Sequence, residues 1–312
     1  MSALATLFPV FFMIFLGLLC RIKGWVTPEQ KAGANTIIFN ILFPILIFKI
    51  LLTAEINVSA LYIVLYVFIM FMLAMVVGKL LGGKATEKYA HIVPFMLTTC
   101  EGGNVALPLY LTIVGSAFAS NTVIFDLAGT ATAFIVIPIL VAKMAAGKTS
   151  AKDLIKAMVT NSFIIAVFFG LVLNLTGIYA ALLSSAWGEV ITNTLTTVTS
   201  PISSMILFLI GYDLKVDMET LPSLLKVMAI RILYMAIVIA GFFVFFKTKM
   251  AEKEYMIAVI LYFMCPTGFA MPALVGPIYK DPEQDNSFLS AFMSLFMIVT
   301  LIVYACLVVY YG

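Results

Sequence analysis

Long apolar runs, separated by short stretches of Gly, Pro and charged residues, follow one another along the chain. Each run approaches the ~20 apolar residues that an α-helix needs to cross the hydrocarbon of a bilayer. The pattern predicts an all-α membrane protein with ten transmembrane helices. The predicted spans are residues 3–20, 34–53, 59–81, 90–116, 121–145, 154–176, 187–212, 223–246, 254–278 and 286–311.

Composition excludes most other classes of protein. Of the 312 residues, 63% are hydrophobic and 11% are charged, which is too apolar for a soluble domain. The net charge of +3 reflects an uneven distribution of Lys and Arg between the loops and not a basic binding surface. We therefore expect no nucleic-acid partner. The four Cys lack a CxxC spacing and there is one His, so we expect no metal and no cofactor. The predicted location is a bilayer, the inner (plasma) membrane of a bacterium.

The distribution of Lys and Arg between the loops predicts how the chain is oriented in the membrane. With these spans, the loops of one face carry thirteen Lys or Arg residues and those of the other face carry four. The four are Lys49, Lys247, Lys249 and Lys253. Because cytoplasmic loops are the basic ones, both termini are predicted to lie outside. No Lys or Arg precedes the first apolar run, which is therefore expected to be a permanent span and not a signal peptide.

The two halves of the chain carry matching marks. Phe15-Leu16-Gly17-Leu18 is echoed 153 positions later by Phe168-Phe169-Gly170-Leu171. Two further pairs in matching spans are Pro44 with Pro201 and Pro108 with Pro272. Since each half contains an odd number of spans, the second half enters the membrane upside down. The sequence thus predicts two inverted five-helix repeats, residues 1–150 and 151–312.

Gly and Pro interrupt the fourth and ninth spans near their middles. The interruptions are Cys100-Glu101-Gly102-Gly103-Asn104 leading to Pro108, and Cys265-Pro266-Thr267-Gly268 leading to Pro272. Unpaired backbone at this depth is tolerated only against protein or a water-lined cavity. We expect half-helices to begin near Pro108 and Pro272, with amides that attract an anion, and the two broken helices to cross. The carbonyl ends near Glu101 and Cys265 could instead hold a cation.

Several polar residues lie within the predicted spans. A carboxylate such as Glu101 costs roughly 2.5–3.5 kcal/mol near mid-bilayer, which favours a role in sodium or proton coupling over a structural hydrogen bond. Asp126 lies nearer a span end and is expected to be solvated, and Arg231 is expected to snorkel to an interface. The Thr-rich seventh span, including Thr197, and Asn35 in the second span either bond neighbouring helices or line a substrate path.

These residues resemble the auxin efflux carrier family, which includes plant auxin exporters and bacterial permeases associated with malate and malonate. Pro266-Thr267-Gly268 is similar to the family's Pro-x-Gly crossover, and Asn35, Pro44 and Phe48 stand at its spacing in span two. Pro201 followed by Gly211 and Leu214 resembles its span-seven ending. The sequence departs from the family at Glu101, where many relatives have Asn.

The resemblance implies a fold like that of bile-acid sodium symporters. In that fold, spans one, two, six and seven form a scaffold, and spans three to five with eight to ten form a moving transport unit. The plant relatives also imply a homodimer.

The predicted function is secondary transport of a small organic anion, a dicarboxylate or auxin-like acid, by alternating access. The predicted substrate-binding residues are Asn104, Pro108, Thr267, Gly268, Pro272, Asn35 and Thr197. Glu101 is predicted to bind the coupling ion, Na⁺ or H⁺. The alternative is a cation/proton antiporter, or a sodium-coupled symporter of another substrate, on the same fold. No enzymatic activity is expected, since GxSxG and HExxH motifs are lacking.

Overall fold

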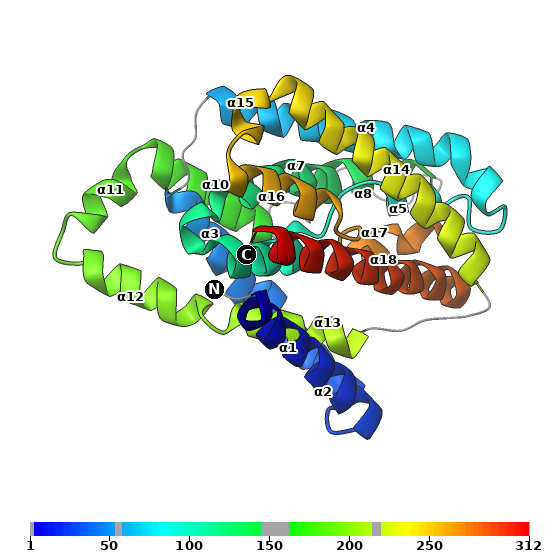
Figure 1. Ribbon diagram of the computed structural model, residues 1–312, viewed down its shortest axis with the longest axis horizontal. Coiled ribbons are helices and arrows are strands. Elements are labelled where there is room, and N and C mark those ends of the chain that lie inside the picture. Colours follow the sequence, from blue (N-terminus) through cyan, green and yellow to red (C-terminus); the bar gives the residue numbers. More distant parts are fainter. Residues whose placement is uncertain (1–2, 54–57, 145–161, 214–219, 312) are drawn as a thin grey trace.

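A computed structural model describes residues 3–53, 58–144, 162–213 and 220–311 (Figure 1). Within these ranges the chain is helical and no strand occurs, which confirms the all-α prediction. The helices up to residue 144 are α1 (Ala3–Lys23), α2 (Pro28–Ile37), η1 (Ile38–Leu42), α3 (Phe43–Thr53), α4 (Val58–Ala85), α5 (Val93–Leu97), η2 (Gly102–Ala106), α6 (Leu107–Val114), η3 (Ser116–Phe118), α7 (Ser120–Ala131), η4 (Thr132–Val136) and α8 (Ile137–Met144).

The helices from residue 162 onward are α10 (Ser162–Leu175), α11 (Ile178–Leu183), α12 (Gly188–Thr199), α13 (Ile202–Asp213), α14 (Leu221–Phe245), α15 (Lys247–Met250), α16 (Lys253–Phe263), α17 (Met271–Val275), η5 (Gly276–Ile278) and α18 (Pro282–Tyr311). Local signals set several boundaries. Gly24 and Gly177, both at positive φ, separate neighbouring helices. Thr27 and Gln30 form a capping box at the start of α2, with Pro28 in its first turn.

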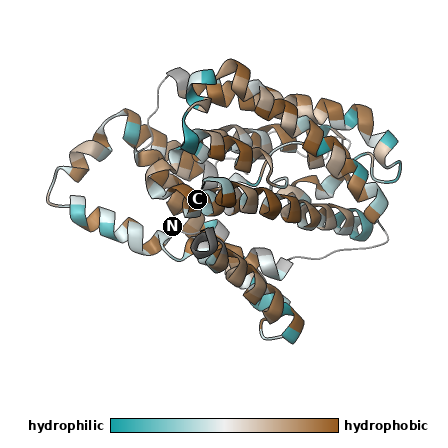
Figure 2. Ribbon diagram, viewed as in Figure 1, coloured by the Kyte–Doolittle hydropathy of each residue, from teal (hydrophilic) through white to brown (hydrophobic). Residues whose placement is uncertain are grey.

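Five helices among the described residues are long and apolar enough to cross a membrane. They are Pro28–Thr53, Ala60–Ala85, Ser120–Val141, Leu221–Phe245 and Pro282–Tyr311. Their outward faces carry large exposed apolar side chains such as Leu61, Leu233 and Val244, as lipid contact requires. Figure 2 shows hydrophobic residues along the helices and hydrophilic ones mainly at their ends. The chain is an integral membrane protein.

The other predicted spans correspond to shorter or interrupted helices. Range 3–20 falls in α1, range 187–212 is divided into α12 and α13 at Pro201, and range 154–176 contains α10, with residues 154–161 outside the described part. Ranges 90–116 and 254–278 each contain a break in the helix. The count of ten spans stays a prediction.

Glycines bring two pairs of helices into backbone contact. A Cβ on Gly17 of α1 would lie 1.9 Å from the carbonyl oxygen of Phe208 in α13, and a Cβ on Gly211 of α13 would lie 1.8 Å from that of Ile14 in α1. A residue with a side chain could not occupy either position without separating the helices. These two glycines therefore fix how closely α1 and α13 pack.

The echo of Gly17, Gly170 in α10, packs against α3. A Cβ on Gly170 would lie 2.9 Å from Leu51 Cβ. One turn on, the side-chain amide of Asn174 donates to the carbonyls of Leu51 at 2.7 Å and Leu52 at 3.1 Å. Each echoed glycine thus sits in a helix of one half of the chain and packs against a helix of the other half.

The helices α1, α2, α3, α10, α12 and α13 form a first group through these contacts. A second group of helices surrounds an aromatic core. Figure 1 shows α4, α14, α16, α7 and α18 stacked on one side of the molecule and α1, α2, α12 and α13 on the other. Helices α4 and α14 run antiparallel, since Tyr66 donates to the Val238 carbonyl at 2.8 Å and Tyr234 to the Met70 carbonyl at 2.6 Å. Phe125 of α7 fills the centre of this group.

We predict that Gly17→Ala destabilises the fold, because the added methyl group must push the Phe208 carbonyl away. A clash of this kind costs about 1–3 kcal/mol. Gly33→Ala in α2 is the matched control, since a Cβ there meets no atom within 4 Å. Thermal unfolding of the two purified variants in detergent checks this. Equal melting temperatures for both variants would contradict the described α1–α13 contact.

Candidate functional site

Two helices are interrupted inside the second group. Helix α5 ends at Leu97, and the chain resumes helical structure at the π-helical turn η2, which continues into α6. Between them Thr98 is extended and Thr99 is left-handed, with φ 52°. A β-branched residue in that region costs about 1–3 kcal/mol unless its surroundings hold it there. The second break separates α16 from α17, and Pro272 lies in the first turn of α17, as predicted.

The first of the two half-helices begins earlier than predicted. Pro108 lies in the first turn of α6, but α6 is preceded without interruption by η2. The free helix start is therefore at Gly102 and Gly103 and not at Pro108. The paired glycines, which the sequence placed inside the break, form the first turn of the new helix.

The two breaks lie against each other; we call the contact between residues 98–103 and 264–269 the crossover. The Glu101 amide donates to the Pro266 carbonyl at 2.8 Å. The hydroxyl oxygens of Thr99 and Thr267 are 3.2 Å apart, and the Thr267 hydroxyl reaches the Thr98 carbonyl at 2.9 Å. Backbone groups that lose their helical partners at one break are thus bonded by the other break.

Arg231 lies on α14, outside the two interrupted segments, and its side chain donates hydrogen bonds to both of them. Its guanidinium, 0% exposed, donates to carbonyls of both interrupted segments, and not to the membrane interface that the sequence suggested. The acceptors are the carbonyls of Met96 at 2.8 Å, Thr98 at 3.3 Å, Thr99 at 2.7 Å and Cys265 at 3.0 Å. Helix α5 and helix α16 both end here, so a cation meets the negative ends of two helices. The expectation of a snorkelling anchor was wrong.

Glu101 lies in the first break, and its side chain points to the second break, between α16 and α17. Its carboxylate accepts a hydrogen bond from the amide of Phe269, just before α17, and the residue is 7% exposed. The carboxylate therefore neutralises a donor at the start of one half-helix. Gly268, next to it, has room for a methyl group, since a Cβ there would lie 3.7 Å from the nearer Glu101 oxygen. Gly268 and Phe269 are half-buried and Ala270 is exposed, so the crossover is nearest to the surface on this side.

Asp126 belongs to the same site, which the sequence did not indicate. Its carboxylate accepts from the hydroxyl of Tyr262 at 3.1 Å and from the amide of Gly103. A Cβ on Gly102 would lie 2.1 Å from an Asp126 oxygen, so only glycine allows this approach. The expectation that Asp126 is simply solvated was wrong, because a span drawn in one dimension does not show which neighbour a side chain meets.

The second glycine of the pair faces the other group of helices. A Cβ on Gly103 would lie 2.0 Å from the ring of Phe43, the first residue of α3. Phe43 is buried, so its ring packs directly on the backbone of η2. The crossover therefore touches the first group of helices, through α3, at a glycine backbone.

The remaining predicted site residues lie elsewhere or are not described. Asn104 is in η2, but its side chain is outside the described part. Asn35 is half-buried in α2, and within the described chain its side-chain oxygen has no hydrogen-bond partner. Thr197 is exposed on α12. On that helix, Thr196 and Thr199 accept hydrogen bonds from Lys49 of α3, which favours interhelical bonding for part of the polar stripe.

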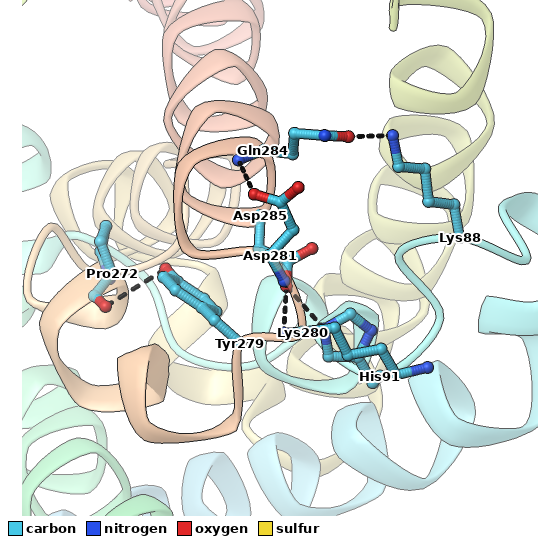
Figure 3. Close-up of polar contacts among 8 residues, drawn as sticks. All are labelled: Lys88, His91, Pro272, Tyr279, Lys280, Asp281, Gln284 and Asp285. Carbon is cyan, nitrogen blue, oxygen red and sulfur yellow. Dashed lines mark hydrogen bonds and ion pairs between the residues drawn. The ribbon is translucent and has the colours of Figure 1, made fainter.

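A second polar cluster joins the loop before α5 to the start of α18 (Figure 3). Asp285 Oδ2 lies 3.0 Å from His91 Nε2 and accepts from the amide of Lys280 at 2.7 Å. Tyr279 points to the Pro272 carbonyl and donates to it at 3.2 Å. Burial, with the charge of Asp285, raises the pKa of Tyr279 to about 12, so the donor stays protonated at neutral pH. Tyr279 thus ties the first turn of α17 to the segment before α18.

Neither a protein-family model nor a curated protein matches the chain. The functional assignment therefore depends on the residues and geometry of the crossover.

We predict that Arg231→Met strongly destabilises the protein, because carbonyls of both breaks lose their donor in a buried place. Removing one partner of a buried charged cluster costs about 3–5 kcal/mol. Arg231→Lys should be intermediate, since one ammonium group cannot reproduce the planar set of donors. Lys226→Met, an exposed cation on the same helix, is the control. A melting temperature of Arg231→Met equal to that of the control would rule out this role.

Proposed function

We propose that the protein is a secondary transporter of a small organic anion, a dicarboxylate or auxin-like acid, of the auxin efflux carrier type. The observation that carries the proposal is the crossover itself. Two interrupted helices meet there, with backbone groups, one guanidinium and two carboxylates gathered within an apolar protein. Interrupted helices within a membrane protein are where transporters bind substrates and coupling ions.

The helix packing supports two inverted repeats of five spans, 1–150 and 151–312. Gly17 and Gly170, equivalent in the proposed repeats, each pack against a helix of the other half. This reciprocal contact is what a two-fold relationship requires. With α2 and α12, the helices α1, α3, α10 and α13 make up the proposed scaffold of spans one, two, six and seven, and spans three to five with eight to ten make up the proposed transport unit. A homodimer and termini outside the cell complete the proposal.

Charge at the crossover bears on the coupling ion. Arg231 already occupies the carbonyl ends where a bound cation would otherwise be expected. With Glu101 and Asp126 both ionised, these three side chains sum to one net negative charge, which repels an anionic substrate. Protonation of one carboxyl group removes that charge. We therefore propose H⁺, not Na⁺, as the coupling ion, with Glu101 as its binding residue.

The substrate would approach from the Gly268–Ala270 side, where the crossover is nearest to the surface. Thr267, Gly268 and Asn104, with the amides at the starts of η2, which leads to Pro108, and of α17, which contains Pro272, would contact its carboxylate. Asn35 and Thr197 belong to the proposed scaffold and would line the path.

One alternative has an observation in its favour. Two carboxyl groups next to the same pair of breaks also suit a cation/proton antiporter, in which Glu101 and Asp126 exchange protons for a metal cation. The two functions differ in whether an organic acid is required for transport.

We predict that Gly268→Leu lowers carboxylate uptake into proteoliposomes by about tenfold or more, equivalent to ~1.4 kcal/mol of lost binding. The larger side chain enters the space beside Glu101. Gly268→Ala is the matched control and should retain uptake, because its methyl group makes ordinary contacts. Asn104→Ala should also reduce uptake. Unchanged uptake in both Gly268→Leu and Asn104→Ala would mean that the site lies elsewhere.

For Glu101→Gln we predict carboxylate binding without coupling. Glutamine keeps an acceptor for the Phe269 amide but cannot exchange a proton, so an imposed pH gradient should no longer accelerate uptake. Uptake under pH and sodium gradients, with and without the organic acid, measures this. A response to the pH gradient equal to that of the unmodified protein would remove Glu101 from coupling. Ion exchange with no organic acid present would favour the antiporter.

A further inference from the structure

A groove lies at the membrane edge, away from the crossover. It runs between the start of α4 and the end of α14, beneath α15, and has a volume of about 630 Å³. This is within the ~300–1,000 Å³ of pockets that hold small ligands. Apolar side chains of α4 and α14 form its walls. The wall residues are Tyr62, Leu65, Ile69, Met70 and Phe245.

The floor of the groove is fixed. Tyr66 donates to the Val238 carbonyl at 2.8 Å, and its ring packs edge-on against Phe242 at 4.9 Å. A Cβ on Gly241 would lie 2.0 Å from the Tyr66 hydroxyl, so the ring fills a place that glycine leaves open. The floor of the groove is therefore fixed by packed side chains, whereas the walls are formed by exposed apolar side chains such as Tyr62 and Leu65.

The mouth of the groove is basic. Lys247, Thr248 and Lys249 line it, and its described lining contains no Asp or Glu. Lys247 is exposed, and Lys249 lies 5.8 Å from the centre of the Tyr255 ring. Both lysines follow the last turn of α14, where a spanning helix reaches the headgroup region. They belong to the small group of Lys residues on the face that the sequence predicts to be poor in positive charge.

We propose that this groove binds one anionic phospholipid. Its phosphate lies between Lys247 and Lys249, with Thr248 as a further donor, and one acyl chain lies along Leu65 and Ile69. Basic residues next to an apolar groove between spanning helices are the arrangement that recognises an acidic headgroup together with its chain. The lipid also gives Lys247 and Lys249 a partner on a face with few other positive charges.

The test uses the purified, delipidated full-length protein. Phosphatidylglycerol added in mixed micelles should raise the melting temperature, and native mass spectrometry should show one retained lipid, whereas phosphatidylcholine should do neither. The double variant Lys247→Gln/Lys249→Gln should bind phosphatidylglycerol at least tenfold more weakly. Lys79→Gln/Lys84→Gln, at the other end of α4, is the control. Equal binding by both double variants would overturn the proposal.

A second variant separates the acyl chain from the phosphate. Leu65→Trp fills the groove and leaves the lysines in place, so phosphatidylglycerol binding should fall, whereas Leu73→Trp, exposed on the same helix, should not change it. Inorganic phosphate and glycerol phosphate should not stabilise the protein. Stabilisation by either one equal to that by the lipid, or full lipid binding by Leu65→Trp, would show an anion site without an acyl-chain groove and overturn the proposal.

Discussion

One buried guanidinium supplies hydrogen-bond donors to the backbone carbonyls that two interrupted helices leave without helical partners. Two helices stop inside an apolar protein, and their final carbonyls have no partners within their own helices. Arg231 supplies donors to both ends from a third helix, and arginine suits this role because its planar group presents several N–H bonds in fixed directions. The bonds of Glu101 to Pro266 and Phe269 require the two breaks to stay in register, and the Arg231 bridge holds that register.

Where helical structure resumes after each break, a side-chain carboxylate accepts a hydrogen bond from a backbone amide. Asp126 accepts from the amide of Gly103 at the start of η2, and Glu101 accepts from the amide just before α17. The crossover thus carries its own cation at the carbonyl ends and its own anions at the amide ends. In the proposed transport function, an anionic substrate would compete with these internal partners for the same amides.

The residues that interrupt regular structure made the breaks predictable. Gly102-Gly103 and Pro272 mark them because glycine and proline act on the backbone of their own segment. Arg231 and Asp126 were misjudged because their roles depend on neighbours far away in sequence. The available signal was the presence of a charge well inside an apolar run, which insertion costs permit only with a partner. The packing of α1 on α13 was not predicted for the same reason, since the echo of Gly17 at Gly170 indicated a repeat and not which helix each glycine contacts.

The contact between Phe43 and Gly103 sets how the two groups of helices meet. An aromatic ring rests there on the backbone of Gly103, which has no side chain to interlock with it. Interdigitated side chains resist sideways displacement, because each must change rotamer to pass the next. A flat ring on a smooth glycine surface has no such barrier. At this contact, therefore, the Phe43 ring can slide over η2 with little resistance.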